Sequence, residues 1–125
     1  MWPLLFCQQK ENTMNLDAML AQLQKDYVTE LPDKISQMES HYTTGDFEAL
    51  RDDFHKIKGT GKTYGLPEVS LLGEATENLC IHKPQALPEA IPLAIAILKD
   101  IHQKRSQGHE MPIATDPRYQ KLTRL

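Results

Sequence analysis

One histidine of this chain has neighbours that suit chemistry on its ring. His55 is followed by Lys58 and Lys62 three and seven residues later, with Gly59 between them and Arg51 four residues before. At about 100° per residue these positions gather on one face of a helix. Neutral imidazole is a competent nucleophile near neutral pH, and the lysines could neutralise the charge of a phosphorylated ring. The spacing therefore suits a histidine that carries a phosphoryl group, with Gly59 leaving room for the phosphate and a partner's surface.

A plainer interpretation stays open at this point, because lysines on a helix often form only a solvated face. The remaining histidines are interpreted as partly exposed imidazoles. No histidine pairs with another histidine, a cysteine or an acid at a ligand spacing, and the Glu-x-x-His pairs of cation-binding bundles are missing from the sequence. No metal site is therefore predicted. The other histidines are His41, His82, His102 and His109.

The helix that carries His55 is predicted from apolar residues spaced three or four apart. Asp46 is a suitable N-cap, Gly65 can end the helix, and Pro67 suits the first position of the next one. Each glycine inside the helix costs about 1 kcal/mol relative to alanine, so something other than helix stability explains them. The predicted buried stripe consists of Phe47, Leu50, Phe54, Ile57, Gly61 and Tyr64.

An apolar stripe before this helix is interrupted by Pro32, which removes one backbone donor and crowds the previous turn. We expect a short first helix, a bend or break near residues 25–30, and a second helix that ends near Thr43. The stripe consists of Leu16, Leu20, Leu23, Tyr27, Leu31, Ile35, Met38 and Tyr42.

Further helices are expected after Pro67 and from Pro88 to Gly108, and no strand-like alternation is evident in the sequence. The prediction is an all-α fold, an antiparallel four-helix bundle with a short extra N-terminal helix. We divide the chain into an N-terminal extension (1–14), the bundle (15–108) and a C-terminal tail (109–125).

Composition excludes some broad classes of function. The 125 residues carry a formal net charge of −3 with mixed signs, which argues against general nucleic-acid binding. Cys7 and Cys80 match no disulfide or zinc spacing and are expected to be reduced thiols. No run approaches the ~18 apolar residues of a membrane helix. A cytoplasmic monomer without membrane or nucleic-acid partners is expected.

The segment FHKIKGTGKTYGLPEVSLLGEATENL resembles the signature of histidine-containing phosphotransfer (HPt) domains. That pattern is His-x-x-Lys-Gly, a turn rich in small residues, and a Gly-Leu step. The stretch from YVTELPDKISQME through GDFEALRDDF is similar to the helix that leads into the signature, so the resemblance covers Leu16 to Ile101. It implies a four-helix bundle whose exposed histidine, here His55, passes a phosphoryl group between response-regulator receiver domains or from a kinase.

The resemblance also implies roles for neighbours of the histidine. Lys58 would stand near the phosphate, and Gly59 would keep the site open. In the similar domain of chemotaxis kinases a glutamate on the next helix hydrogen-bonds the imidazole, and Glu77 matches its place. Lys62 is not a fixed member of the pattern, so its support of the phosphate rests on helix geometry alone. Arg51 and Lys56 are assigned to a partner-docking face.

No nucleotide-binding motif accompanies these residues. Gly61-Lys62-Thr63 is similar to the end of a phosphate-binding loop, but Lys56 stands where that loop requires glycine. The chain is therefore expected to be a phosphotransfer intermediate without kinase activity of its own, and to bind no cofactor. Its partner, a receiver domain or a hybrid histidine kinase, would supply Mg²⁺ and most of the transition-state stabilisation. The alternative is a helical-bundle adaptor that docks such a partner without carrying phosphate.

Overall fold

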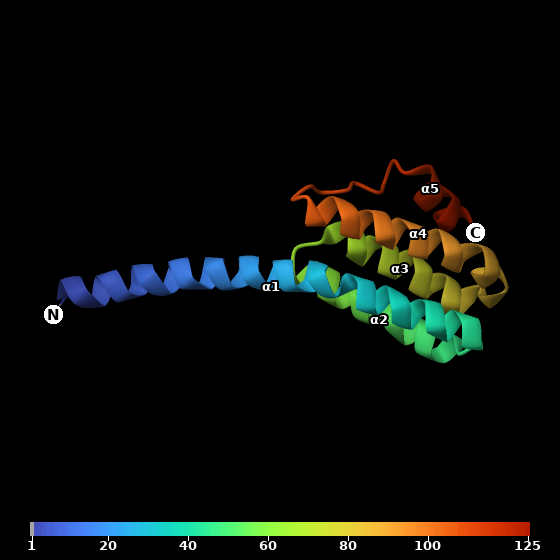
Figure 1. Cartoon of the computed structure of the whole chain (residues 1–125), viewed down its shortest axis with the longest axis horizontal. Coiled ribbons are helices and arrows are strands. Elements are labelled where there is room, and N and C mark those ends of the chain that lie inside the picture. Colours follow the sequence, from blue (N-terminus) through green and yellow to red (C-terminus); the bar gives the residue numbers. More distant parts are fainter. Residues whose placement is uncertain (1) are drawn as a thin grey trace.

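The computed structural model describes the backbone of residues 2–125 and the side chains from Asn15 onward. Within that range the fold is all-helical and contains no strand, which confirms the predicted all-α class. None of the helices in residues 2–125 is both long enough and apolar enough to cross a membrane. The elements are α1 (Trp2–Thr44), α2 (Phe47–Thr63), α3 (Pro67–His82), the 3₁₀ turn η1 (Pro84–Ala86), α4 (Leu87–Ser106) and α5 (Pro117–Arg124) (Figure 1).

The ends of α2 follow the sequence signals. The side chain of Asp46 accepts a hydrogen bond from the backbone N–H of Ala49 at 3.1 Å, so it caps the helix as predicted. Gly45 and Gly65 flank α2 with φ values of 72° and 78°, a backbone conformation that favours glycine. Pro67 begins α3, where its missing N–H leaves no hydrogen bond unmade.

The prediction of two separate helices in the first helical region, and with it the short extra N-terminal helix, is wrong. α1 is one helix from Trp2 to Thr44, and it continues through Pro32. Pro32 itself is exposed, whereas Leu31 and Ile35 on either side of it are buried in the core. Burial of an amphipathic face supplies most helical stability in proteins, and here it outweighs the roughly 3 kcal/mol that proline costs inside a helix.

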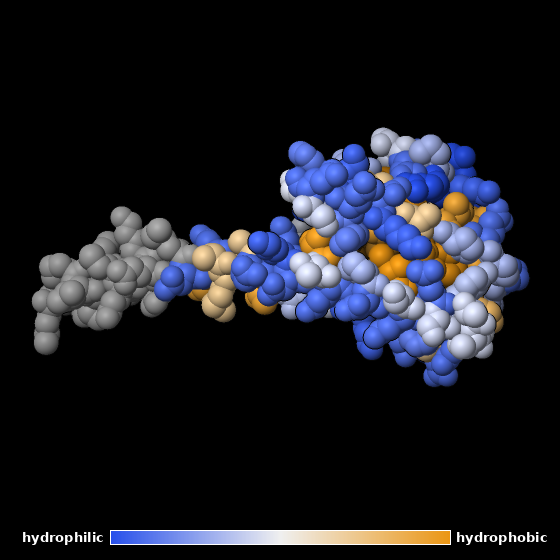
Figure 2. Space-filling view, viewed as in Figure 1, coloured by the Kyte–Doolittle hydropathy of each residue, from blue (hydrophilic) through white to orange (hydrophobic). Residues whose placement is uncertain are grey.

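The N-terminal half of α1 projects from the bundle as an arm (Figure 1). Leu16, Leu20 and Leu23, which the spacing placed on the buried stripe, are 57%, 54% and 40% exposed. Apolar side chains are visible along the described part of this arm (Figure 2). The hydrogen bond from Gln24 Nε2 to the carbonyl of Tyr64, at 2.8 Å, ties α1 to the turn between α2 and α3.

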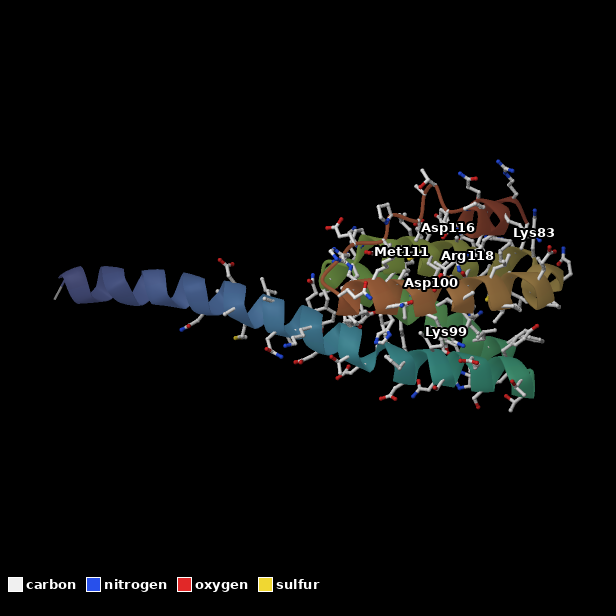
Figure 3. The ribbon with its side chains drawn as sticks, turned by 45° about the horizontal axis from the view of Figure 1, so that its top comes forward. Lys83, Lys99, Asp100, Met111, Asp116 and Arg118 are labelled. Carbon is white, nitrogen blue, oxygen red and sulfur yellow. The ribbon has the colours of Figure 1, made fainter. Side chains whose placement is uncertain are left out.

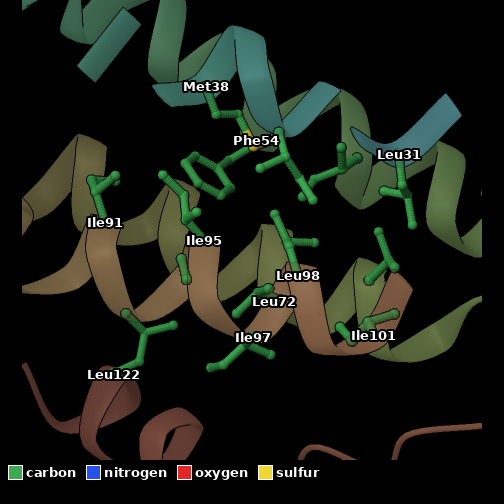
Figure 4. Packing of buried hydrophobic residues seen from close by; sticks show 14 of the residues in the cluster. Leu31, Met38, Phe54, Leu72, Ile91, Ile95, Ile97, Leu98, Ile101 and Leu122 are labelled. Carbon is green, nitrogen blue, oxygen red and sulfur yellow. The ribbon is translucent and has the colours of Figure 1, made fainter. Parts of the chain in front are cut away.

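The hydrophobic core lies where α1, α2, α3 and α4 meet, and α2 contributes one stripe to it. Leu50, Phe54 and Ile57 are at most 2% exposed. Figure 4 shows Phe54 among Met38 of α1 and Ile95 of α4. Since one side of α2 faces this core, the opposite side, which carries His55, faces outward.

The buried stripe of α2 is shorter than predicted. Phe47 is 48% exposed because it is the first residue of the helix and lies beyond the end of the core. Tyr64 follows the last residue of α2 and is half-buried, with its ring centroid 5.4 Å from that of Tyr27. The two ends of the stripe therefore contribute less to the core than spacing alone indicates.

The C-terminal segment contains a helix that periodicity did not predict. α5 packs on the bundle through Leu122, which is 0% exposed, and Ile113 in the preceding loop is 1% exposed. Arg118 forms ion pairs with Asp100 of α4 at 2.7 Å and with Asp116 at 2.8 Å (Figure 3). These hydrogen bonds from Arg118 hold the pKa of Asp116 below its usual range. Our division of the chain at residues 14 and 108 stays a prediction.

Candidate functional site

The imidazole of His55 stands on the outward face of α2. Its side chain is 71% exposed, whereas Phe54 and Ile57 on the opposite side of the same turn are buried. The ring is therefore accessible to a macromolecule, and the helix that carries it is anchored by core packing.

Glu77 of α3 holds one nitrogen of this ring. The distance from His55 Nδ1 to Glu77 Oε2 is 2.5 Å, and the glutamate side chain is only 9% exposed. A carboxylate accepts hydrogen bonds, so a neutral ring facing it carries its proton on Nδ1. That tautomer leaves the lone pair of Nε2 free for nucleophilic attack.

Lys58 completes a group of three side chains. Its Nζ atom lies 3.6 Å from Oε1 of Glu77, and its side chain is 41% exposed. The two oxygens of one carboxylate thus face an imidazole and an ammonium group. Lys58 therefore provides a positive charge one helical turn from His55, on the α3 side of the ring.

The other predicted residues of this face are exposed but less tightly placed. An added Cβ at Gly59 would have nothing within 4 Å, so the surface next to His55 is open. Lys62 is exposed two turns along α2 from His55. Arg51 is 46% exposed and lies 4.0 Å from Asp52.

Cys80 borders the site on α3. Burial raises the pKa of its thiol to about 11, with the charge of Arg51 lowering it and that of Glu77 raising it. The thiol is therefore protonated at neutral pH and a poor nucleophile.

Lys56 does not join the group around His55. It lines a hollow between α1 and α2 together with Lys34, Asp53 and Thr60. Because it lies about 100° around α2 from His55, it belongs to the α1 flank, whereas Glu77 approaches from the α3 flank.

A second imidazole–carboxylate pair lies on the α1 flank of α2. His41 Nδ1 of α1 is 2.5 Å from Asp53 Oδ2 of α2, and the histidine side chain is 32% exposed. Sequence reasoning missed this pair, because its members lie on different helices at a spacing that indicates no contact. His41 resembles His55 in its carboxylate partner but is less than half as exposed.

Sequence reasoning also missed two residues of α3 that contact α2 beside the site. Ser70 Oγ donates a hydrogen bond to the carbonyl of Lys58 at 2.7 Å. Gly73, one turn before Glu77, is buried against α2. A glycine in a helix interior, four residues from a proposed imidazole partner, was the available signal.

The chemistry of this arrangement is that of a single nucleophilic nitrogen with charged neighbours. In the part of the chain whose side chains are described, no group of three His, Cys, Asp or Glu residues is placed to hold a metal ion. His55 Nε2 is the group that can form a bond, Glu77 orients it, and Lys58 supplies positive charge.

Comparison with known proteins gives a family match. A family model described as "Hpt domain" matches residues 22–107, a segment that contains His55, Lys58 and Glu77. Comparison with curated proteins and with solved structures gives no match.

Proposed function

The chain belongs to the Hpt domain family, and from this premise we propose that it is the histidine phosphocarrier of a two-component phosphorelay. Hpt domains take part in histidine phosphotransfer as carriers rather than kinases, and they interact with receiver domains and kinases. In our proposal a phosphoryl group passes between His55 and a receiver-domain aspartate or a kinase. The family scaffold, four antiparallel helices, would be formed by α1 to α4.

The observation that carries this proposal is that the ring of His55 is both exposed to solvent and held in one orientation. His55 is 71% exposed, yet its Nδ1 is held by a nearly buried carboxylate. Ordering a ring before its partner arrives lowers the entropy cost of reaction in the encounter complex. A solvated surface histidine would need no such partner.

The proposed step transfers a phosphoryl group between two acceptors. The lone pair of His55 Nε2 attacks the phosphorus of an aspartyl phosphate, a P–N bond forms, and the P–O bond to the aspartate breaks, so that the carboxylate leaves. The Nδ1 proton stays between the ring and Glu77, where the carboxylate stabilises the positive charge that develops on the imidazole. The reverse step returns the phosphoryl group to a receiver.

Charged neighbours would stabilise the phosphorylated ring. Lys58 is partly exposed, so its ammonium can serve both Glu77 and a phosphate on Nε2. Lys62 would add positive charge from two turns along α2. The open position at Gly59 would admit the phosphate and the partner's surface.

The remaining chemistry would come from the partner. We propose that a receiver domain, or the receiver of a hybrid kinase, supplies Mg²⁺ and most of the transition-state stabilisation from its own acidic site. Arg51 would contact this partner beside His55. Lys56 would contribute only if the partner also covers the α1 flank of α2.

The test is transfer from a phosphorylated receiver domain in the presence of Mg²⁺. Label on this chain should be labile in acid and stable in alkali, as a phosphohistidine is. His55→Gln should keep the helical circular dichroism of the wild type and accept no label. His41→Gln is the matched control, because it removes the other carboxylate-bound imidazole, and it should accept label normally.

Two outcomes would contradict the assignment. Label that persists on His55→Gln would place the acceptor elsewhere. A receiver that binds the chain tightly but never transfers phosphate would favour the adaptor alternative.

A further inference from the structure

Gly73 occupies the closest approach between α3 and the turn of α2 that carries the site. An added Cβ at this position would lie 2.8 Å from the backbone oxygen of Phe54, 2.8 Å from the backbone nitrogen of Lys58, and 3.0 Å from a side-chain carbon of Ile57. The first two atoms form one helical hydrogen-bond step of α2, the step that spans His55. α3 therefore packs directly on the backbone beneath the histidine.

This contact leaves no room for adjustment by side chains. Real Cβ atoms essentially never approach another heavy atom closer than 3.0 Å, so any side chain at position 73 requires the two backbones to separate by a few tenths of an ångström. Two of the three atoms it would meet are backbone atoms of a helix anchored in the core, and they cannot rotate away. α3 would have to move outward.

Such a movement would be felt first at Glu77. This residue lies one turn after Gly73 on the same face of α3, and its carboxylate reaches His55 at 2.5 Å and Lys58 at 3.6 Å. We propose that Gly73 is a positioning residue, whose lack of a side chain sets the separation of α2 and α3 at which Glu77 can hold His55. The proposal rests on the proposed function only where it concerns the effect of Gly73 on phosphoryl transfer.

Other glycines of the chain provide controls. Gly61 of α2 is equally crowded, with an added Cβ 2.8 Å from the backbone nitrogen of Ser70, but it lies toward the α2–α3 turn and away from Glu77. Gly59 has nothing within 4 Å. Gly61→Ala thus tests crowding of the same helix pair, and Gly59→Ala tests the substitution of glycine by alanine without crowding.

The first measurement is the imidazole ¹⁵N spectrum of the full chain at about pH 8, where histidine rings are mostly neutral. His55 of the wild type should show the tautomer protonated on Nδ1. In Gly73→Ala its signals should move toward a mixture of tautomers, whereas those of His41 should not. Gly59→Ala should leave the His55 signals unchanged, and Gly61→Ala should move them less than Gly73→Ala does.

The second measurement asks whether Gly73 acts through Glu77. Gly73→Ala should slow transfer from a phosphorylated receiver by about tenfold, since a misplacement of about 1 Å can cost about a hundredfold and the shift expected here is smaller. In a Glu77→Ala background, which has no acceptor for His55 Nδ1–H, Gly73→Ala should slow transfer no further. The proposal would be overturned if the effects of the two substitutions on the transfer rate multiply. It would also be overturned if Gly73→Ala folds and shows the His55 signals of the wild type.

A second variant guards against a Gly73→Ala protein that does not fold. Ser70→Ala removes the hydrogen bond to the carbonyl of Lys58 without adding bulk, so it loosens the same contact. It should move the His55 signals in the same direction by a smaller amount, and unchanged signals would count against the proposal. The spectra need no phosphate, so failure of the wild type to accept a phosphoryl group would refute only the proposed function.

Discussion

Lys58 and Glu77 form an ion pair beside His55, with 3.6 Å between Nζ and Oε1. The carboxylate is nearly buried and its other oxygen faces the imidazole, so the lysine offsets the charge of a group that the site needs in its ionised form. The pair links the two helices on which the proposed chemistry depends.

We predict that Lys58→Ala alters phosphotransfer more than it alters folding. The lysine exchanges no proton in the reaction, so its loss should slow transfer or change the lifetime of the phosphohistidine. Because the side chain is 41% exposed, the free energy of unfolding should fall by no more than about 1 kcal/mol. Transfer kinetics and urea unfolding of the same preparation measure both effects.

Lys62→Ala is the companion to that variant. It removes the same charge from the same face of α2, two turns from His55. Its effect on transfer should be smaller than that of Lys58→Ala, because charge interactions weaken with distance in water and salt. Equal effects would show that Lys58 acts only through general charge and not through its place beside Glu77.

Gly59 should separate folding from transfer. An added Cβ there meets nothing, so Gly59→Ala should stabilise the bundle by roughly 0.5–1 kcal/mol through helix propensity. Gly59→Leu should also fold, with a melting temperature near or above that of the wild type, but its side chain should obstruct the approach to His55. Normal transfer by the leucine variant would show that a partner docks elsewhere.

The Glu68–Arg105 pair should make stability depend on pH. Burial disfavours the charged form of Glu68, but hydrogen bonds from Arg105 at 2.8 and 3.0 Å and from the N–H of Met111 at 3.1 Å outweigh it and lower the pKa of the carboxyl. A lowered folded-state pKa adds stability above the unfolded-state value of 4.5, and this contribution is lost as pH falls through the folded-state pKa.

Urea unfolding at neutral pH and below pH 4.5 measures this dependence. The free energy of unfolding should fall in acid for the wild type and less steeply for Glu68→Gln. At neutral pH, Arg105→Ala should lower the free energy of unfolding by about 3 kcal/mol, because it leaves a buried carboxylate without its charged partner. An unchanged acid dependence in Glu68→Gln would assign the effect to other carboxylates.

The C-terminal segment should contribute to the stability of the bundle. Leu122 of α5 is fully buried, so Leu122→Ala should lower the free energy of unfolding by about 2–3 kcal/mol. Thr123→Ala, on the exposed side of the same helix, should change it by less than about 0.5 kcal/mol. If both variants unfold like the wild type, α5 does not stay docked in solution.

The sequence by itself determined the features that depend on neighbours within one helix. The central part of the buried stripe of α2, its cap at Asp46 and its termination before Gly65 follow from spacing and local backbone preferences. For the same reason the shared face of His55, Lys58 and Gly59 could be predicted, since residues three and four apart on a helix are adjacent.

Features that depend on distant residues could not be predicted in this way. α1 continues through Pro32 because Leu31 and Ile35, on either side of the proline, are buried against other helices. Local sequence rules include the cost of the proline but not this burial. The helix α5 is too short and too polar for periodicity to detect, and it is held by burial of Leu122 on the bundle.

The candidate site was likewise predicted only in part from the sequence. Resemblance placed Glu77 near His55, but only the tertiary structure sets how closely its carboxylate approaches the ring and that Lys58 shares it. That approach depends on the packing of α3 against the backbone of α2 at Gly73. The separation of two helices is decided by the groups packed between them, which come from both helices and leave no periodic signal in either one.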